Sequence, residues 1–575
     1  MTRQDRWLRR SFSAWLLMLA MPVAAQSSGV FSAGFDRSAD RYDADAARFL
    51  TQSTFGPTFG DIAHLRAIGN TAWIDEQMAL PATHHLPRLL PSGDYGDYYT
   101  VARQEAWFRT ALDADDQLRQ RVAFALSEIM VVSDRGALAG QVFSLTSYYD
   151  MLVDGAFGNY RDLLENVTLH PAMGVYLSML GNERPDPVAN VRPDENYARE
   201  VMQLFSIGLE MLNLDGSIKD GDAGTPGIQP IPAYDQFVVK GLAHVFTGWN
   251  WLECANPENW NAPWEVLPDI QATSGWRSPM QAWAGMHDDG EKQLMSYSGA
   301  GLGSPIVLPA GGTPEAGLQD ALDVLFNHPN VGPFISRQLI LRLVTSNPSP
   351  AYIARVAGIF NNNGSGVRGD LAAVVRAILL DPEARAGDRR LSETGGKLRE
   401  PLVRVTHMLR ALNAVMPTGR VYPWGPEQDY GQAALRSPSV FNFFTPHYSL
   451  PGEISQRGLV SPEFQITTDT TIVSTTNQIA ANIYWAYLNP PDTDDYDGFV
   501  VDLGPEEPFG DDPAALVSRY DLLFMNGWMS PGMRQLLIDH VAAMSNDEWH
   551  PDYRRERVQD ALVLILTSPQ YAVQK

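Results

Sequence analysis

The stretch that indicates the fold most clearly reads Pro193-Asp194-Glu195-Asn196-Tyr197-Ala198-Arg199-Glu200-Val201-Met202-Gln203-Leu204-Phe205. Its apolar residues recur at the spacing of one helix face, in the order Tyr197, Val201, Leu204, Phe205 and Gly208. Glu195 and Arg199 share a second face, and Asn196, Glu200 and Gln203 share a third. The stretch therefore predicts a helix that carries either a polar network in the core or a functional site.

Helical spacing continues on both sides of this stretch. It predicts a helix from Ala46 that ends before Phe55, and further helices over 118–130, 148–157, 161–169, 234–245, 317–326, 331–343, 351–360, 371–380, 397–411, 467–487, 513–524, 533–543 and 555–566. Several of them end in a polar residue followed by proline, as in Leu169-His170-Pro171. We therefore expect a mainly α fold of stacked helical hairpins, with a Trp-rich irregular insert and at most small β-hairpins.

Residues 44–575 are expected to form one large helical domain with inserts near 213–235, 250–312 and 413–465. The first insert contains Asp215-Gly216, which is typical of a hairpin turn. Asn213, Asp215 and Ser217 have the spacing of a calcium loop, but the positions that need glycine and glutamate do not match, so a surface turn is favoured. The second insert is rich in tryptophan, including Trp251, Trp260, Trp264, Trp276 and Trp283.

The first residues have the pattern of an export signal. Four arginines precede an apolar run over 14–21, and the small residues of Pro22-Val23-Ala24-Ala25 follow, which predicts a signal peptide over residues 1–25. A signal anchor is the alternative. Arg9-Arg10-Ser11-Phe12 also fits a twin-arginine signal, which directs export of an already folded protein. Twin-arginine export and ordinary secretion therefore both remain open. Residues 26–43 are expected to be a flexible lead-in, and the mature protein is expected in the periplasm or outside the cell.

Charge and cysteine content narrow the function classes. The chain has 575 residues and a net charge of −24, and removal of four arginines and one aspartate with residues 1–25 makes it −27. This balance argues against nucleic acid and anionic membrane surfaces as partners. No second long apolar segment follows residues 14–21, so stable membrane insertion is not expected. Cys254 is the one cysteine, so an intrachain disulfide and a thiolate metal cluster are excluded. Cys254 itself is either a nucleophile or a buried thiol.

Two groups of residues could carry chemistry. Glu195, Arg199 and Glu200 are the candidate catalytic residues, with a glutamate as acid or base and the arginine as an anion-binding or orienting group.

A divalent metal is the cofactor that the second group suggests. Its candidate ligands are His170, His244, His287 and Asp288. Each histidine also has a simpler reading: His170 at a helix end, His244 in a core and His287 in a capped turn.

Reaction-defining motifs are absent from the sequence. It has no Gly-x-Ser-x-Gly elbow, no phosphate-binding loop with Gly-Lys-Ser/Thr, no His-Glu-x-x-His and no Glu-x-x-His pair. The common serine hydrolase, nucleotide-binding and zinc protease classes are therefore disfavoured.

Several ordered motifs resemble the bacterial family known as domain of unknown function 1800. They are Ala47–Pro57, Phe157–Leu164, His170–Gly174, Glu195–Glu200, Phe246–Trp249, His287-Asp288-x-Gly290-x-Lys292, Asn327–Pro329 and Lys397-x-x-x-Pro401. The resemblance covers about residues 44–572 and implies an exported, mainly helical protein of undetermined activity. It also implies a partner, because genes of this family often lie beside those of an exported sulfatase-like protein.

Two hypotheses follow for the function. The first is a protein that acts with or on another exported protein, for which tryptophans exposed in the insert would serve as anchors. The alternative is a metal-dependent or acid/base exported enzyme, hydrolase-like, with its polar site around Glu195, Arg199 and Glu200. Carbohydrate binding through the tryptophans is a third possibility, weighed against tryptophans that simply belong to the core.

Overall fold

The computed structural model describes residues 38–90, 100–252, 260, 274–296, 304–386, 394–421, 425–485, 497–548 and 550–575. The predicted signal peptide, most of the predicted lead-in, Cys254 and Trp264 lie outside these residues. Inside them, no helix combines the length and the apolar character that a bilayer crossing requires.

Helices dominate the first part of the chain. They are α2 (Ser38–Ser53), α3 (Phe59–Ile68), α4 (Asn70–Ala79), η1 (Leu86–Arg88), α5 (Thr100–Asp113), α6 (Gln117–Ser127), α7 (Val142–Gly155), α8 (Tyr160–Leu169), α9 (Pro171–Tyr176) and α10 (Asn196–Gln203). The helix α2 begins at Ser38, so the end of the segment expected as a flexible lead-in is helical.

The remaining helices continue to the end of the chain. They are α11 (Gln236–Val245), η4 (Ser274–Trp276), η5 (Ala284–Met286), α13 (Pro314–Asn327), α14 (Val331–Leu343), α15 (Pro350–Asn361), α16 (Leu371–Leu380), α17 (Pro382–Arg385), α18 (Pro401–Ala411), α19 (Pro426–Tyr430), α20 (Glu453–Gln456), η7 (Pro462–Ile466), α21 (Asp469–Trp485), η9 (Gly504–Asp511), α22 (Pro513–Met525), α23 (Pro531–Ala542), α24 (Tyr553–Leu566) and α25 (Pro569–Ala572). The mainly α prediction is therefore confirmed.

The β structure among the described residues is three antiparallel pairs of short strands. They are β1 (Trp249–Asn250) with β2 (Gln281–Ala282), β3 (Lys292–Met295) with β4 (Ile306–Leu308), and β5 (Lys397–Leu398) with β6 (Val573–Gln574). The first two pairs lie in the Trp-rich insert. The third joins the middle of the chain to its last residues.

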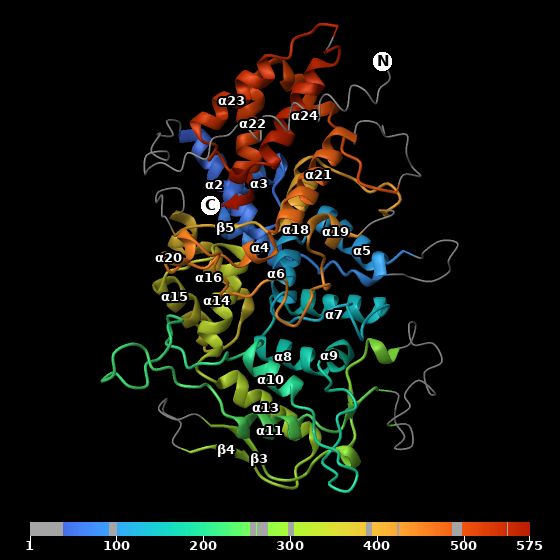
Figure 1. The fold of residues 1–575 in the computed structure, drawn as a ribbon, viewed down its shortest axis with the longest axis vertical. Coiled ribbons are helices and arrows are strands. Elements are labelled where there is room, and N and C mark those ends of the chain that lie inside the picture. Colours follow the sequence, from blue (N-terminus) through green and yellow to red (C-terminus); the bar gives the residue numbers. More distant parts are fainter. Residues whose placement is uncertain are drawn as a thin grey trace.

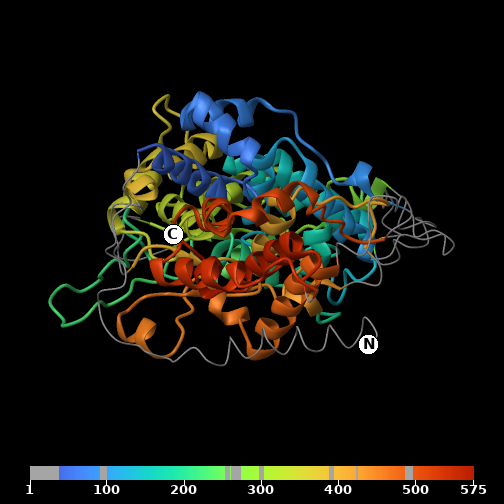
Figure 2. The ribbon, with the colours of Figure 1, turned by 90° about the horizontal axis from the view of Figure 1, so that it is seen from above.

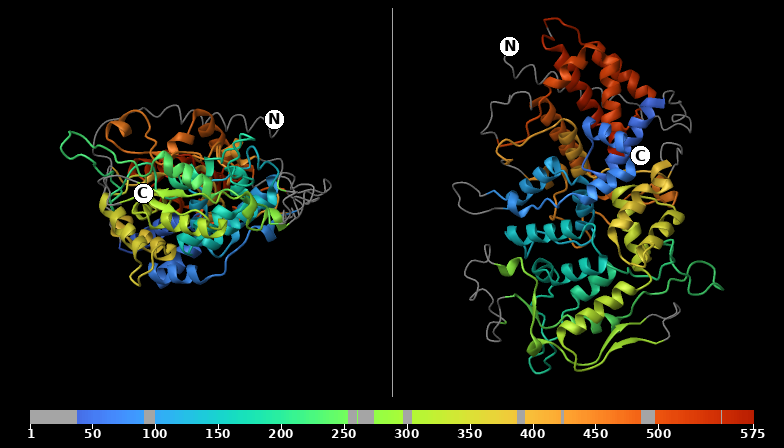
Figure 3. Two further views of the ribbon diagram at one scale, coloured as in Figure 1. Left: turned by 90° about the horizontal axis from the view of Figure 1, so that it is seen from below. Right: turned by 180° about the vertical axis from the view of Figure 1, so that it is seen from behind.

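The molecule is elongated, with the C-terminal helices at one end and the inserts near 213–235 and 250–312 toward the other (Figure 1). The helices α22, α23 and α24 lie at the upper end, next to α2 and α3, and α11, α13, β3 and β4 lie at the lower end. Viewed from behind, the β3–β4 hairpin forms the lower edge (Figure 3). The helix α2 contacts α6, α16 and α22, so it packs against elements that lie far apart in the chain.

Residues 209–233 form a long arm that projects from the body (Figures 1 and 2). Backbone hydrogen bonds join its two sides, from Ala233 N to Leu209 O at 2.9 Å and from Gly221 N to Gln229 O at 2.8 Å. The turn predicted at Asp215-Gly216 is present, with Leu212 bridged to Ile218. The carboxylate of Asp215 accepts the amide and hydroxyl protons of Ser217, as a surface turn requires.

The recurring polar–proline pairs mark junctions between consecutive helices. In His170-Pro171, Asp381-Pro382 and Ser568-Pro569 the polar side chain accepts a backbone N–H of the next helix, and the proline occupies its first turn. Proline suits that position because its missing N–H would have no partner within the helix. The pattern is therefore a repeated way of ending one helix and starting another.

Two sequence predictions need correction here. Lys397 does not begin a helix, because Lys397–Leu398 is a strand and the helix starts at Pro401. Proline disfavours the α conformation of the residue before it, so the helix cannot readily extend back through Glu400. Among the tryptophans of the insert that the structure describes, Trp251, Trp260 and Trp276 are not exposed anchors, because they are buried. Their indoles pack together and against the core, so the aromatic-anchor and carbohydrate readings lose their basis at these positions.

The close approach of α11 to β3 depends on Gly241. A Cβ atom at this position would lie 1.9 Å from the carbonyl oxygen of Gln293. We expect G241A to lower the free energy of unfolding by about 3 kcal/mol, because backbone must move to make room. G358A in α15 is the control, since nothing lies within 4 Å of an added Cβ there. Urea unfolding of both variants checks this, and equal midpoints would contradict the packing.

Candidate functional site

Asp194 and Asn182 fix the start of α10. Asp194 Oδ1 accepts the Asn196 amide at 2.7 Å, and the Asn182 side chain accepts the Asp194 amide at 2.8 Å. On the buried side, the Tyr197 hydroxyl donates to Thr168 Oγ1 at 2.6 Å and its ring packs edge-on against Phe246 after α11. The apolar stripe of the sequence is therefore the face that holds α10 against α8 and α11.

Glu195 and Arg199 form an ion pair at the surface. Arg199 Nη2 lies 3.1 Å from Glu195 Oε2, and the two side chains are 41% and 33% exposed, respectively. The same carboxylate oxygen accepts Gln236 Nε2 from α11 at 2.8 Å. An exposed pair of this kind adds at most about 1 kcal/mol to stability. Because both side chains are partly exposed, they are available for contact with other molecules.

Glu200 has a different environment on the same helix. Its residue is 7% exposed, and its Oε2 is buried without a hydrogen-bond partner. Burial raises the pKa of this carboxyl, and nearby Arg199 opposes the rise. Two phenols are near enough to sense its charge: burial raises the pKa of Tyr176 to about 12 and also raises that of Tyr234. Because its pKa is raised, this desolvated carboxyl is a stronger proton acceptor than an exposed glutamate.

His244 and Asp288 form a pair at the end of α11. His244 Nδ1 contacts Asp288 Oδ2, and both side chains are partly exposed. Asp288 Oδ1 accepts the Gly290 amide at 3.0 Å. Burial would raise the pKa of Asp288, but the Gly290 amide and His244 hold it below its usual value. A carboxylate on Nδ1 leaves His244 Nε2 as a possible proton acceptor, in the arrangement that orients a general base.

His287 fastens the loop that carries Asp288. It is buried, and its Nδ1 lies 2.9 Å from the Thr247 carbonyl oxygen. Burial lowers its pKa, so the ring is neutral and donates this hydrogen bond. Thr247 Oγ1 accepts the Asp288 amide at 2.9 Å, and Lys292 Nζ donates to the Gly290 carbonyl at 2.9 Å. The two motifs around Thr247 and His287 are therefore one structural unit.

His170 serves the junction between α8 and α9. Its Nδ1 accepts the Ala172 amide at 3.1 Å, and its Nε2 lies 3.1 Å from Ser147 Oγ. Burial lowers its pKa to about 3, so the ring stays neutral at any physiological pH. Both nitrogens are used by the fold.

Of the four predicted metal ligands, the structure joins His244 and Asp288. His170 faces Ser147 and the Ala172 amide, and His287 faces Thr247. Within the described part of the chain, no three His, Cys, Asp or Glu side chains gather as a metal site would require. A bound divalent metal thus stays a prediction from the sequence.

A buried charge network lies elsewhere in the core, and sequence patterns did not indicate it. Lys397 Nζ lies 3.0 Å from Glu463 and 3.5 Å from Glu400, and it donates to the Arg342 carbonyl at 2.8 Å. The Arg342 guanidinium in turn lies 3.6 Å from Glu128. These five residues come from four separate segments of the chain, so no local spacing could have indicated the cluster.

Glu128 and Glu400 both belong to this network, but their carboxyl groups differ in protonation. Burial and the charge of Glu400 raise the pKa of Glu128 well above its usual range. Burial would also raise the pKa of Glu400, but Lys397 and a hydrogen bond from Glu128 lower it. Glu128 is therefore the protonated partner, and Gln432 donates to Glu400 at 2.7 Å to support the ionised one.

The fold and these sites define a mainly α-helical protein with a polar surface site on α10 and α11 and a charge network in its core. The family described as "Protein of unknown function (DUF1800)" matches residues 48–573. The chain belongs to this family, which confirms the resemblance drawn from the motifs. No curated protein and no solved structure matches the chain.

The unequal roles of Glu128 and Glu400 can be measured. We expect E128Q to leave the free energy of unfolding nearly unchanged at pH 7, because the amide can still donate to Glu400. E400Q should lower it by about 3 kcal/mol, because it removes the ionised partner of a buried lysine. Denaturant unfolding of the two variants checks this, and a larger loss for E128Q would reverse the assignment.

Proposed function

We propose that this protein is exported and acts on or with another exported protein through the end of the molecule that carries α10, α11 and the arm. The supporting observation is that exposed apolar side chains are frequent in one stretch of the sequence. Five of the sixteen large exposed hydrophobic residues in the described part of the chain fall between 188 and 237. They are Val188, Leu209, Leu214, Ile228 and Phe237.

Polar residues lie beside these apolar residues in the chain, and protein interfaces combine the two kinds of residue in this way. Phe237, 70% exposed, follows Gln236, which donates to Glu195 beside Arg199. The arm adds acidic residues at Glu210, Asp215, Asp220 and Asp222 against one lysine. A partner with an apolar patch inside a basic rim fits this surface. The exported sulfatase-like protein suggested by the family resemblance is the first partner to test.

Acid/base chemistry is the second candidate function, and Glu200 favours it. Its buried, unpartnered oxygen is the feature expected of a carboxyl kept ready for proton transfer. The oriented His244–Asp288 pair on the next helix offers a second proton-transfer group. No contact joins Glu200 to His244 within the described residues, so each group is tested separately.

The partner proposal predicts a specific loss of binding. F237S is expected to weaken binding of the purified sulfatase-like protein at least about tenfold, which corresponds to about 1.4 kcal/mol from one exposed aromatic side chain. F441S is the control, because Phe441 is 48% exposed and lies outside this surface. Titration calorimetry or biolayer interferometry checks both variants. Equal binding by F237S, F441S and the unmodified protein would count against the proposal.

The state of Glu200 predicts a pH dependence of stability. Because its pKa is raised in the folded protein, unfolding becomes easier as pH rises from about 4.3, the value in an unfolded chain, through the folded pKa. E200Q removes this loss, so its thermal midpoint should exceed that of the unmodified protein at pH 8 and converge with it toward pH 4.5.

The same measurement on E195Q is the control, because that change removes an exposed carboxylate from the same helix. A midpoint difference for E200Q that stays constant across pH would remove Glu200 as a proton-transfer group.

A further inference from the structure

A groove of about 430 Å³ lies between the β3–β4 hairpin and α13, at the lower end of the molecule (Figure 1). The hairpin lines it with residues 294–295 and 306–309. The helix contributes one face, which consists of Asp320, Asp323, Val324, Asn327 and His328. The volume of the groove lies in the range of ligand-binding sites.

The groove follows the open edge of β4. Within the described residues β4 pairs with β3 alone, so its second edge has no strand partner. Successive side chains of a strand point to opposite faces, yet Ile306, Val307 and Leu308 all line the groove. A groove against one face of the hairpin would be lined by alternate residues, so this groove also follows the β4 backbone. An open strand edge presents N–H and C=O groups with which another extended chain can pair.

Apolar side chains form the hairpin wall of the groove. Leu294 and Met295 of β3 are buried there. Leu308 packs beside Gly317 of α13, where an added Cβ would lie 3.2 Å from the leucine Cδ2 atom. Val307 is 44% exposed on the same strand. Apolar side chains of a bound segment would lose contact with water against this wall, which favours binding.

The helix that forms the other wall is acidic. The α13 sequence contains Glu315, Asp320 and Asp323 and has no lysine or arginine. Asp323 is paired with Arg161 at 2.6 Å. Asp320 is exposed, and it makes no ion pair within the part of the chain that the structure describes. A lysine or arginine of a bound segment would therefore find an open carboxylate at Asp320.

The charges at the two ends of this wall differ. Lys219 and Arg368 are near enough to His328 to lower its pKa, and with burial they bring it to about 3. His328 is therefore neutral, and it lies eight residues after Asp320, which is about 12 Å along a helix. The open negative charge is thus at the Asp320 end, which sets the direction in which a segment with one basic end would lie.

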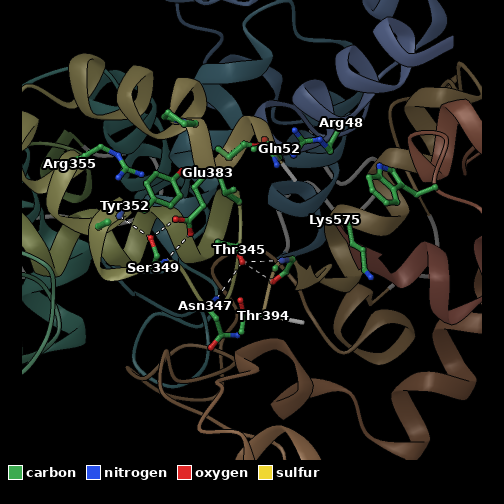
Figure 4. Close-up of a pocket in the computed structure, with 18 residues that line it drawn as sticks. Arg48, Gln52, Thr345, Asn347, Ser349, Tyr352, Arg355, Glu383, Thr394 and Lys575 are labelled. Atoms are coloured by element: carbon green, nitrogen blue, oxygen red, sulfur yellow. Dashed lines mark hydrogen bonds between the residues drawn. The ribbon is translucent and has the colours of Figure 1, made fainter. Parts of the chain in front are cut away.

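The cavity of about 620 Å³ beside α2 and α15 differs in this respect (Figure 4). Glu383 accepts the amide of Ser349 at 2.9 Å and the hydroxyl of the same residue. Arg355 makes two hydrogen bonds to Asp381, at 2.7 and 2.8 Å. These wall groups already bind other parts of the fold. The β4 edge and Asp320 are the groups that a ligand could bind without displacing such contacts.

We propose that an extended segment of the exported partner docks in this groove as a strand added beside β4. Its apolar side chains lie against Leu294 and Leu308, and a lysine or arginine pairs with Asp320. In strand addition, main-chain hydrogen bonds give affinity and alternate side chains give specificity. The net charge of −24 favours a basic segment over a second copy of this chain. The inference rests on the function proposed above and names the part of the partner that binds.

Synthetic peptides test the groove without the partner. The probe is Arg-Val-Thr-Val-Thr-Val-Arg with blocked ends, and one control replaces both arginines with glutamate. A second control keeps the arginines but has N-methyl groups on alternate amides, so that it cannot pair along a strand edge. We expect the probe to bind at least about tenfold more tightly than either control, in titration calorimetry at constant ionic strength. Equal binding of the three peptides, or no binding by the probe, would overturn the proposal.

A charge reversal locates the site. D320K is expected to exchange the preference, so that the glutamate peptide binds more tightly than the arginine peptide. D539K makes the same charge change on the exposed face of α23, at the other end of the molecule, and should leave the preference as it is. An unchanged preference in D320K, or the same exchange in D539K, would overturn the location.

Binding of the purified sulfatase-like protein separates this inference from the function on which it rests. D320K should weaken that binding at least about tenfold, and D539K should not. If F237S weakens binding of the partner but D320K does not, the groove inference is wrong and the proposed function stands. If the partner does not bind the unmodified protein, the proposed function is wrong, and the peptide preference still decides whether the groove accepts an extended basic segment.

Discussion

The contact between the Thr247–Gly248 backbone and the segment around His287 is the constraint on which the lower end of the molecule depends. Gly248 has a φ of +81°, and a Cβ there would lie 2.8 Å from the Trp283 carbonyl oxygen and 2.9 Å from the His287 amide nitrogen. Glycine is required both for this backbone conformation and for this approach. Once the two segments meet, Thr247 holds Asp288, and Asp288 holds His244.

This arrangement separates two kinds of polar residue that the sequence presents together. Glu195 and Arg199 pair at the surface, whereas Glu200 turns inward to a site where its carboxyl is desolvated. His170 and His287 complete the fold, whereas His244 remains partly exposed on an oriented carboxylate. The polar residues of these motifs therefore divide between positions that complete the fold and positions that remain candidates for function.

The periodicity of apolar residues predicts the helices well, because it shows which face of each helix is buried. The segments 331–343 and 371–380 are helices at the predicted bounds. Periodicity continues through Lys397, but the proline at 401 starts the helix later, and Lys397 pairs as a strand with Gln574. The α10 helix ends at Gln203, earlier than its apolar stripe, and the chain then turns through Gly208 at a φ of +73°.

The sites were predictable only in part. The motifs identified α10, the end of α11 and the His287 loop, because these polar residues are close together in the sequence. They did not indicate that Trp251 and Trp276 pack on each other in the core. The Glu128–Glu400 pair joins residues far apart in the chain. Contacts between residues far apart in the sequence arise from tertiary packing, which a local sequence pattern does not indicate.

A double-mutant cycle on His244 and Asp288 tests the central claim that the two motifs form one unit with an oriented histidine. Unfolding free energies of H244N, D288N and the double variant would be measured at pH 7. We expect a coupling energy of about 1 kcal/mol, because the side chains are in direct contact and partly buried. Effects that simply add, with no coupling between the two positions, would contradict the account.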